Sequence, residues 1–154
     1  MRYRSIVSLL LVAVVTFLTS CSSPTVAKGP TYSPEQIAQL QDYVADVQEM
    51  RDRLLAIPPL VQQQRWNDVQ TYIHGPLGEM RVRMSRLARG LEPKLQKEAL
   101  NAAKEVFEHV VLIDEATVAN DSRKALFNYN QALQDFDAFL KYVPAEALGS
   151  ESVS

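Results

Sequence analysis

The chain has 154 residues, with 16 Lys and Arg against 18 Asp and Glu. Without residues 1–20, which carry two arginines and no acid, 134 residues remain with 14 basic against 18 acidic side chains, a net charge of −4. That is the size of one ordinary domain, and its mildly acidic balance argues against nucleic acid as a partner. Only five glycines occur, and frequent Ala, Leu, Gln, Glu, Lys and Arg favour helix, so we expect an all-α fold.

The first twenty residues are typical of an export signal. Arg2 and Arg4 give a short positive start, and an apolar run from Ile6 to Leu18 follows. A bilayer-spanning helix needs roughly 20 apolar residues, so this run is too short to span comfortably, whereas its length and flanks match a secretory signal. We therefore predict that residues 1–20 are a signal peptide of the lipoprotein type.

Cys21 is the only cysteine of the chain, and Leu18-Thr19-Ser20-Cys21 resembles the bacterial lipobox. The resemblance implies that Cys21 receives a diacylglycerol thioether and becomes the first residue of the mature chain. Two or more acyl chains hold a protein stably at a membrane where one does not. The alternative is a plain signal peptide followed by an unpaired thiol. With no second cysteine there is no intrachain disulfide, so packing must carry the stability.

Residues 21–33 are predicted to form a flexible lipidated tether. They contain Pro24, Gly29 and Pro30 and little that could pack. The twelve residues from Ser22 to Ser33 could reach at most about 40 Å when extended. That reach would let a domain meet a partner away from the lipid surface.

The first predicted helix begins at Ser33 and ends before Pro58. Ser33 as N-cap and Gln36 three residues later form a capping-box pattern. Pro58 and Pro59 cannot donate backbone hydrogen bonds, so we expect the helix to stop there and residues 60–65 to be a connection. The apolar positions recur at three-to-four spacing, which predicts one buried face: Ile37, Leu40, Val44, Val47 and Leu54.

The second predicted helix begins near Trp66 and continues to about Leu91, with an interruption at Gly75-Pro76. A proline here displaces the carbonyl of Tyr72, so we expect a kink or a short break. The apolar phase survives across the interruption, which favours two segments stacked on one core. The stripe consists of Val69, Ile73, Leu77, Met80, Met84, Leu87 and Leu91.

The third predicted helix runs from about Pro93 to Ala119 and carries two adjacent apolar lines. Such a wide stripe is typical of a helix that contacts neighbours on two sides, as in a bundle. Asn120-Asp121 is predicted to be a turn with a cap, and a fourth helix follows to about Val143.

Pro144 is expected to end the fourth helix and to leave a frayed tail at 145–154. The last two links between helices are short, which makes the second, third and fourth helices antiparallel neighbours. We therefore predict an all-α, up-down four-helix bundle over residues 34–144, preceded by an extended N-terminal tether.

Catalytic motifs are missing from the sequence. Paired Glu-x-x-His motifs, Cys-x-x-Cys-His, His-Glu-x-x-His and a Gly-rich phosphate loop do not occur. Glu105 and His109 share a helix face and could hold half of a zinc site, although zinc needs three or four ligands and a solvated pair is the alternative. We expect no enzyme activity and no cofactor. A lipid-anchored periplasmic bundle carrying haem or a metal remains the alternative.

Two features are candidates for docking a partner. An arginine run gives residues 79–89 a net charge of +3, which suits an acidic partner; the alternative is a solvated face partly paired with the acids of the first helix. Trp66 is a candidate interface anchor, or it closes one end of the bundle beside the loop. The arginines of the run are Arg81, Arg83, Arg86 and Arg89.

Two stretches carry a family resemblance. They are Arg65-Trp66-Asn67-Asp68-Val69 with Tyr72-Ile73-His74-Gly75-Pro76-Leu77-Gly78, and Ala125 to Pro144 with Tyr129, Asp135-Phe136 and Phe139-Leu140. Together with the lipobox cysteine and the tether, they resemble the cyanobacterial PsbQ proteins, the extrinsic lipoprotein subunits of photosystem II. The similarity covers about residues 33–144 plus the anchor.

The resemblance implies a lipid-anchored protein on the lumenal side of the thylakoid membrane. It would bind the photosystem II core near the inner chlorophyll-antenna protein and the manganese-stabilising extrinsic subunit. There it would support oxygen evolution by shielding and stabilising that side of the complex, and hold no manganese, pigment or substrate. Some members are associated with zinc, but only His74 and His109 could contribute imidazoles here, so the resemblance assigns no metal site.

Overall fold

The computed structural model describes residues 31–149, and in that range the only regular elements are helices, which confirms the all-α prediction. None of these helices combines the length and apolar character needed to cross a bilayer. The signal peptide, Cys21 and most of the predicted tether lie outside the described residues. The elements are α2 (Pro34–Leu54), α3 (Ile57–Gln62), α4 (Trp66–His74), α5 (Met80–Gly90), α6 (Pro93–Val118), α7 (Ser122–Leu140) and the 3₁₀ helix η1 (Ala145–Ala147).

Helix α2 begins with the predicted capping box. The backbone N–H of Gln36 donates to the Ser33 hydroxyl over 3.3 Å, and the Ser33 N–H donates to the Gln36 side chain over 2.8 Å. The predicted tether ran to Ser33, but Tyr32 already belongs to the packed domain. It packs against the core, and its hydroxyl accepts a hydrogen bond of 2.9 Å from the backbone N–H of Glu92.

The predicted connection after the first helix is partly wrong. Helix α2 ends at Leu54, and Pro58 and Pro59 lie in the first turn of the short helix α3. Proline is tolerated there because the first N–H groups of a helix have no partner within the helix. The prolines therefore begin a new helix. The turn before α4 is made by Gln64, whose φ is 57°.

The predicted break at Gly75-Pro76 is confirmed, since α4 ends at His74 and α5 begins at Met80. A Cβ at position 75 would lie 2.9 Å from the carbonyl oxygen of Thr71, so the close backbone approach requires glycine. Ile73 before the break and Leu77 within it are both buried in the same core. The break thus separates two segments that share one apolar interior.

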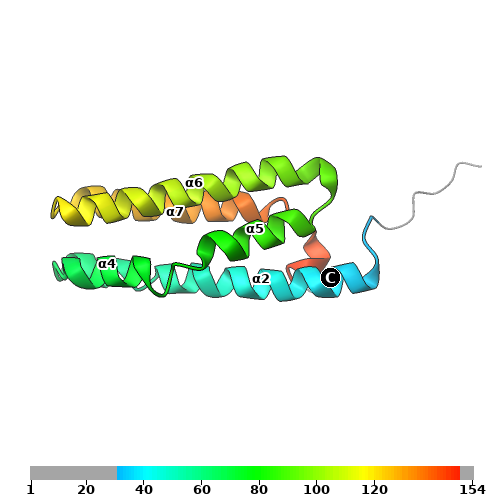
Figure 1. Cartoon of the computed structure of the whole chain (residues 1–154), viewed down its shortest axis with the longest axis horizontal. Coiled ribbons are helices and arrows are strands. Elements are labelled where there is room, and N and C mark those ends of the chain that lie inside the picture. Colours follow the sequence, from blue (N-terminus) through cyan, green and yellow to red (C-terminus); the bar gives the residue numbers. More distant parts are fainter. Residues whose placement is uncertain (1–30, 150–154) are drawn as a thin grey trace, which may run out of the picture. The chain divides into compact units, whose positions relative to one another are not determined.

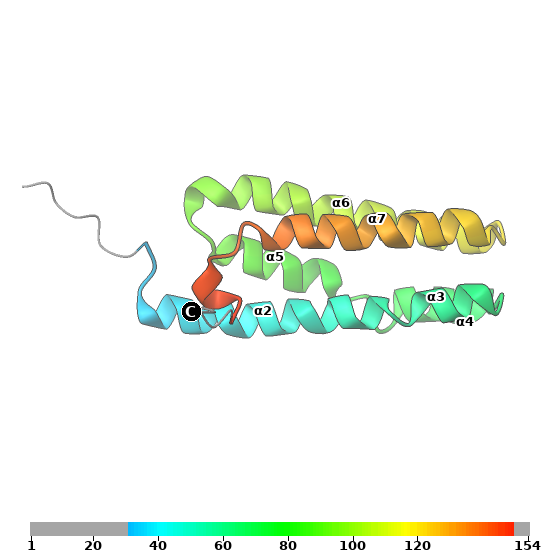
Figure 2. The same cartoon turned by 180° about the vertical axis from the view of Figure 1, so that it is seen from behind.

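The helices pack around one hydrophobic core. Figures 1 and 2 show how they are arranged. Helix α6 lies beside α7 in both views and has its most extensive contact with it, and α5 lies between α2 and α6. Fully burying one large apolar side chain stabilises the fold by about 1.5–3 kcal/mol. The largest fully buried side chains come from most of the helices: Phe136, Phe139, Leu40, Met50, Leu54, Ile57, Met80, Met84, Leu87 and Ile113.

Part of the predicted frayed tail is ordered. Residues 145–147 form η1, which contacts α2, and Ala147 is buried. The side-chain amide of Gln41 donates a 3.0 Å hydrogen bond to the carbonyl of Glu146. The prediction failed because Pro144 marks the end of a helix without saying whether the following residues find a partner.

Candidate functional site

Helix α5 places Arg81 on the side toward α6 and the other three arginines on the side toward α2. Its buried face consists of Met80, Met84, Leu87 and Ala88. With 3.6 residues per turn, residues three apart lie near the same face, whereas residues two apart point to nearly opposite sides, so Arg81 diverges from Arg83. The run in the sequence is therefore not one continuous basic stripe.

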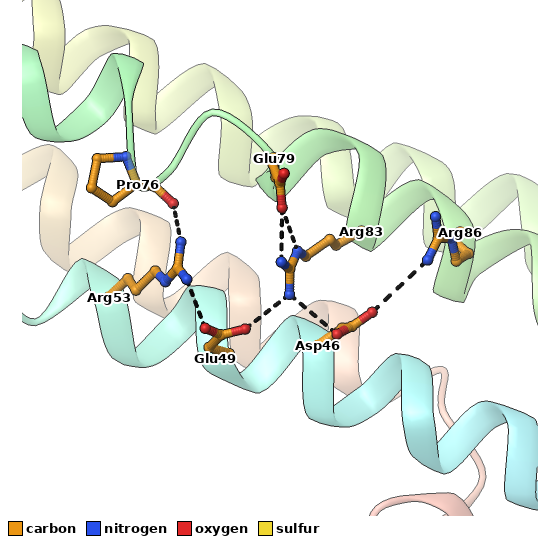
Figure 3. Close-up of polar contacts among 7 residues, drawn as sticks. All are labelled: Asp46, Glu49, Arg53, Pro76, Glu79, Arg83 and Arg86. Carbon is orange, nitrogen blue, oxygen red and sulfur yellow. Dashed lines mark hydrogen bonds and ion pairs between the residues drawn. The ribbon is translucent and has the colours of Figure 1, made fainter.

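Arg83 faces α2 and links the two helices (Figure 3). Its guanidinium lies 3.1 Å from Asp46, 2.9 Å from Glu49 and 2.7 Å from Glu79, and its side chain is only 20% exposed. The hydrogen bonds that Arg83 donates to the Glu79 carboxylate are the main reason that the pKa of Arg83 is raised, with smaller contributions from Asp46 and Glu49. Arg83 is thus occupied by contacts within the domain.

The network continues to the break between α4 and α5. Arg53 lies 2.7 Å from Glu49 and donates a 2.7 Å hydrogen bond to the carbonyl of Pro76 (Figure 3). Arg53 is the largest cause of the lowered pKa of Glu49, and Arg83 adds to it. An arginine of α2 therefore satisfies a carbonyl that the broken helix leaves without a helical partner.

Arg86 and Arg89 border a groove of about 430 Å³ between α2 and α5. The Arg86 guanidinium lies 5.7 Å from the centre of the Tyr43 ring. Its distance to the Asp46 carboxylate is 3.9 Å, which is long for an ion pair. Arg89 is exposed and forms no ion pair with any residue in the range 31–149. Val82 is 61% exposed beside them. The groove combines positive charge with apolar and aromatic surface. Its lining residues are Gln39, Tyr43, Val82, Arg86, Arg89 and Gly90.

Arg81 faces the opposite side of α5, toward α6. Its guanidinium lies 5.0 Å from the centre of the Phe107 ring, a cation–π contact. Trp66, the other predicted docking residue, begins α4 and is half-buried against the core. That position agrees with its predicted alternative role of closing one end of the domain.

His109 of α6 contacts residues of α7. Its Nδ1 is 3.1 Å from the Asn128 side-chain oxygen, and its Nε2 is 3.4 Å from Asp135. The Asn128 amide nitrogen donates to the carbonyl of Lys124, which turns its oxygen toward the histidine. Both ring nitrogens therefore face side-chain oxygens of α7, and the one at Asn128 is within hydrogen-bond distance. Among residues 31–149, no three His, Cys, Asp or Glu side chains gather in a way that could hold a metal ion.

His74 is likewise paired within the domain, since its Nε2 lies 3.0 Å from Asp114 of α6. Tyr43 and Val82 were not predicted as docking residues, yet they share a groove with two of the predicted arginines. A signal for Val82 existed: an apolar residue inside the arginine run, out of phase with the buried stripe.

Comparison with known proteins identifies the family. The family model PsbQ, described as oxygen evolving enhancer protein 3, matches residues 4–144. The chain is also 49% identical over 144 residues to CyanoQ of Synechocystis sp., covering 93% of this chain and 97% of that protein. The resemblance predicted from the sequence is therefore confirmed, and the chain belongs to the PsbQ family.

Proposed function

We propose that this chain is a non-catalytic, extrinsic subunit of photosystem II on the lumenal side of the thylakoid membrane. It docks on the core complex near the inner chlorophyll-antenna protein and the manganese-stabilising subunit, and it stabilises the oxygen-evolving side. The observation that carries the proposal is the match of the oxygen evolving enhancer family over residues 4–144. The relative CyanoQ, similar over nearly its whole length, supports it.

The docking surface in this proposal is the groove between α2 and α5. Arg86 and Arg89 supply positive charge, while Val82 and Tyr43 supply surface that gains by leaving water. Charge of one sign at an interface steers an oppositely charged partner and fixes its orientation. Arg83 is left out of the docking set because its charge is already balanced by three carboxylates.

The scaffold in this proposal is an up-down four-helix bundle over residues 34–144. Helices α2 and α3 would form its first member, α4 and α5 its second, and α6 and α7 the other two. The pattern of contacts supports this arrangement, since α2 contacts α5, α5 contacts α6, α6 contacts α7, and α7 contacts both α2 and α3.

A lipid on Cys21 would hold the subunit at the membrane, with residues 21–31 as a tether. The lipobox-like stretch Leu18-Thr19-Ser20-Cys21 supports this part of the proposal. Cys21→Ser should leave the chain unprocessed or in the soluble fraction. Normal maturation and continued partitioning of Cys21→Ser with membranes would contradict the lipid anchor alone.

The function is tested by isolating photosystem II from the source organism through an affinity tag on a core subunit. The chain should co-purify with the core, and Arg89→Glu should weaken its binding about tenfold or more, which corresponds to about 1.4 kcal/mol. The matched control is Arg123→Glu, an exposed arginine at the start of α7. Complete absence of the chain from the core would defeat the function. Equal binding of the two variants would defeat only the assignment of the docking surface.

A further inference from the structure

A second groove lies on the other side of α5, where this helix meets α6. Its volume is about 460 Å³, close to that of the groove between α2 and α5. Phe107 and Leu112 are half-buried, and Val111 is 52% exposed. Exposed large apolar side chains in a recess are a common mark of a surface that another molecule covers. The groove is lined by Arg81, Lys104, Phe107, Glu108, Val111 and Leu112.

Two of the three charged side chains around this groove pair with each other, and the third has no charged partner among the described residues. Lys104 and Glu108 form an ion pair of 2.7 Å, one helical turn apart, which raises the pKa of the lysine and lowers that of the glutamate. Arg81 contacts the Phe107 ring but forms no ion pair with any residue that the structure describes. A guanidinium has five N–H donors and favours bidentate contact with a carboxylate. One unmatched positive charge therefore lies at the edge of an apolar recess.

We propose that the α5–α6 groove is a second half of the docking surface and takes an apolar side chain of the protein partner, next to an Asp or Glu that pairs with Arg81. The inference rests on the proposed function. Charge complementarity supports the carboxylate, and the exposed Val111 beside the Phe107 ring supports the apolar neighbour. The two grooves flank the same short helix, since Arg86 leans toward Tyr43 of α2 and Arg81 toward Phe107 of α6. A partner that covers α5 would reach both.

The test uses the purified full chain, labelled with a fluorophore, and photosystem II cores that lack this subunit but retain the manganese-stabilising subunit. Arg81→Gln removes the charge and Val111→Ser removes the apolar contact. Paired arginines are frequent hot spots of interfaces, and an apolar side chain that leaves water on binding contributes according to its buried area, so each variant should bind the cores about tenfold more weakly. The matched controls are Arg123→Gln on α7 and Val118→Ser, a 71% exposed valine two turns further along α6 and outside the groove. Both controls should bind like the unmodified chain.

Three outcomes would overturn the inference. Binding of Arg81→Gln and Val111→Ser at full strength, while Arg89→Glu binds weakly, would reject the second groove and leave the proposed function intact. Failure of the unmodified chain to bind cores would reject both. A parallel measurement with phosphatidylglycerol vesicles separates a lipid from a protein partner. If the two variants lose only vesicle binding, the groove takes an anionic lipid instead.

Discussion

The contact between α6 and α7 and the contact between α2 and α5 are built by different means. Helices α6 and α7 are long and uninterrupted. Both bury alanines, to which α6 adds Val106 and Ile113 and α7 adds Phe136 and Phe139. Helix α5 is short, follows a break, and is joined to α2 by the charged network around Arg83 in addition to its apolar face. Apolar burial is the main interaction that holds α6 against α7. The charged network around Arg83 holds α5 against α2, and it leaves Arg81 and Arg89 without a carboxylate partner among the described residues.

The largest test of this contrast is Phe136→Ala on α7. Phe136 is completely buried, so removing its ring should leave a cavity and lower the free energy of unfolding by about 3–5 kcal/mol. Urea denaturation followed by circular dichroism measures the change. Phe127→Ala on the same helix is the control, because that ring is exposed and its loss should cost less than about 0.5 kcal/mol. Similar losses from both variants would contradict the packing of α7.

Arg83→Met tests the charged network on the other side. The variant keeps the length of the side chain but leaves Asp46, Glu49 and Glu79 without their shared cation, so like charges repel one another. We expect the melting temperature to fall by a few degrees, less than for Phe136→Ala, with the difference shrinking at high salt. Arg89→Met should leave the melting temperature unchanged. A larger effect at Arg89 would mean that the arginines have been assigned the wrong way round.

The two turns with positive φ allow a comparison at smaller scale. Gln64 before α4 has φ 57° and Asn120 between α6 and α7 has φ 55°. Asparagine adopts this left-handed conformation more readily than glutamine does, and glycine adopts it freely. Gln64→Gly should therefore raise the free energy of unfolding by about 0.5 kcal/mol, and Asn120→Gly should change it less. Thermal unfolding of both variants decides the order, and the reverse order would show that side-chain contacts outweigh backbone strain.

The smallest expected effect depends on pH. Arg53, and then Arg83, lower the pKa of Glu49 in the folded protein below its ordinary value of 4.5. The carboxylate therefore contributes stability above that value, and the contribution is lost as the pH falls through the lowered pKa. The difference in melting temperature between the unmodified chain and Glu49→Gln should shrink between about pH 6 and pH 3. Asp42→Asn, at an exposed position outside the network, serves as the control for the loss of stability that low pH causes elsewhere in the protein. A constant difference for Glu49→Gln would contradict the ion pairs of Figure 3.

Local sequence signals predicted the elements that depend on neighbouring residues. Ser33 and Gln36 lie three residues apart and form the predicted cap, and Gly75-Pro76 produces the predicted break. The failures concern contacts between distant residues. The ordered segment at 145–147 depends on Gln41, and the packing of Tyr32 depends on Glu92. No spacing in the sequence encodes such pairs.

The candidate site divides in the same way. The arginine run was visible as charge, and the predicted alternative of partial pairing with acids of the first helix is correct for Arg83 and, loosely, for Arg86. Which arginine is paired, and which is open, follows from the direction of each side chain around α5. Phe107 and Val111 lie on another helix, so no pattern within the run could have predicted the groove beside Arg81.

The sequence by itself determined that this protein is helical, where its main helices begin and break, and to which family it belongs, because composition, caps, prolines and apolar spacing act over one or two turns of chain. Tertiary structure decided which charged side chains pair within the domain and which remain available to a partner. That choice depends on the packing of α5 between α2 and α6, where acids of one neighbour neutralise Arg83 and an aromatic ring of the other leaves the charge of Arg81 unmatched.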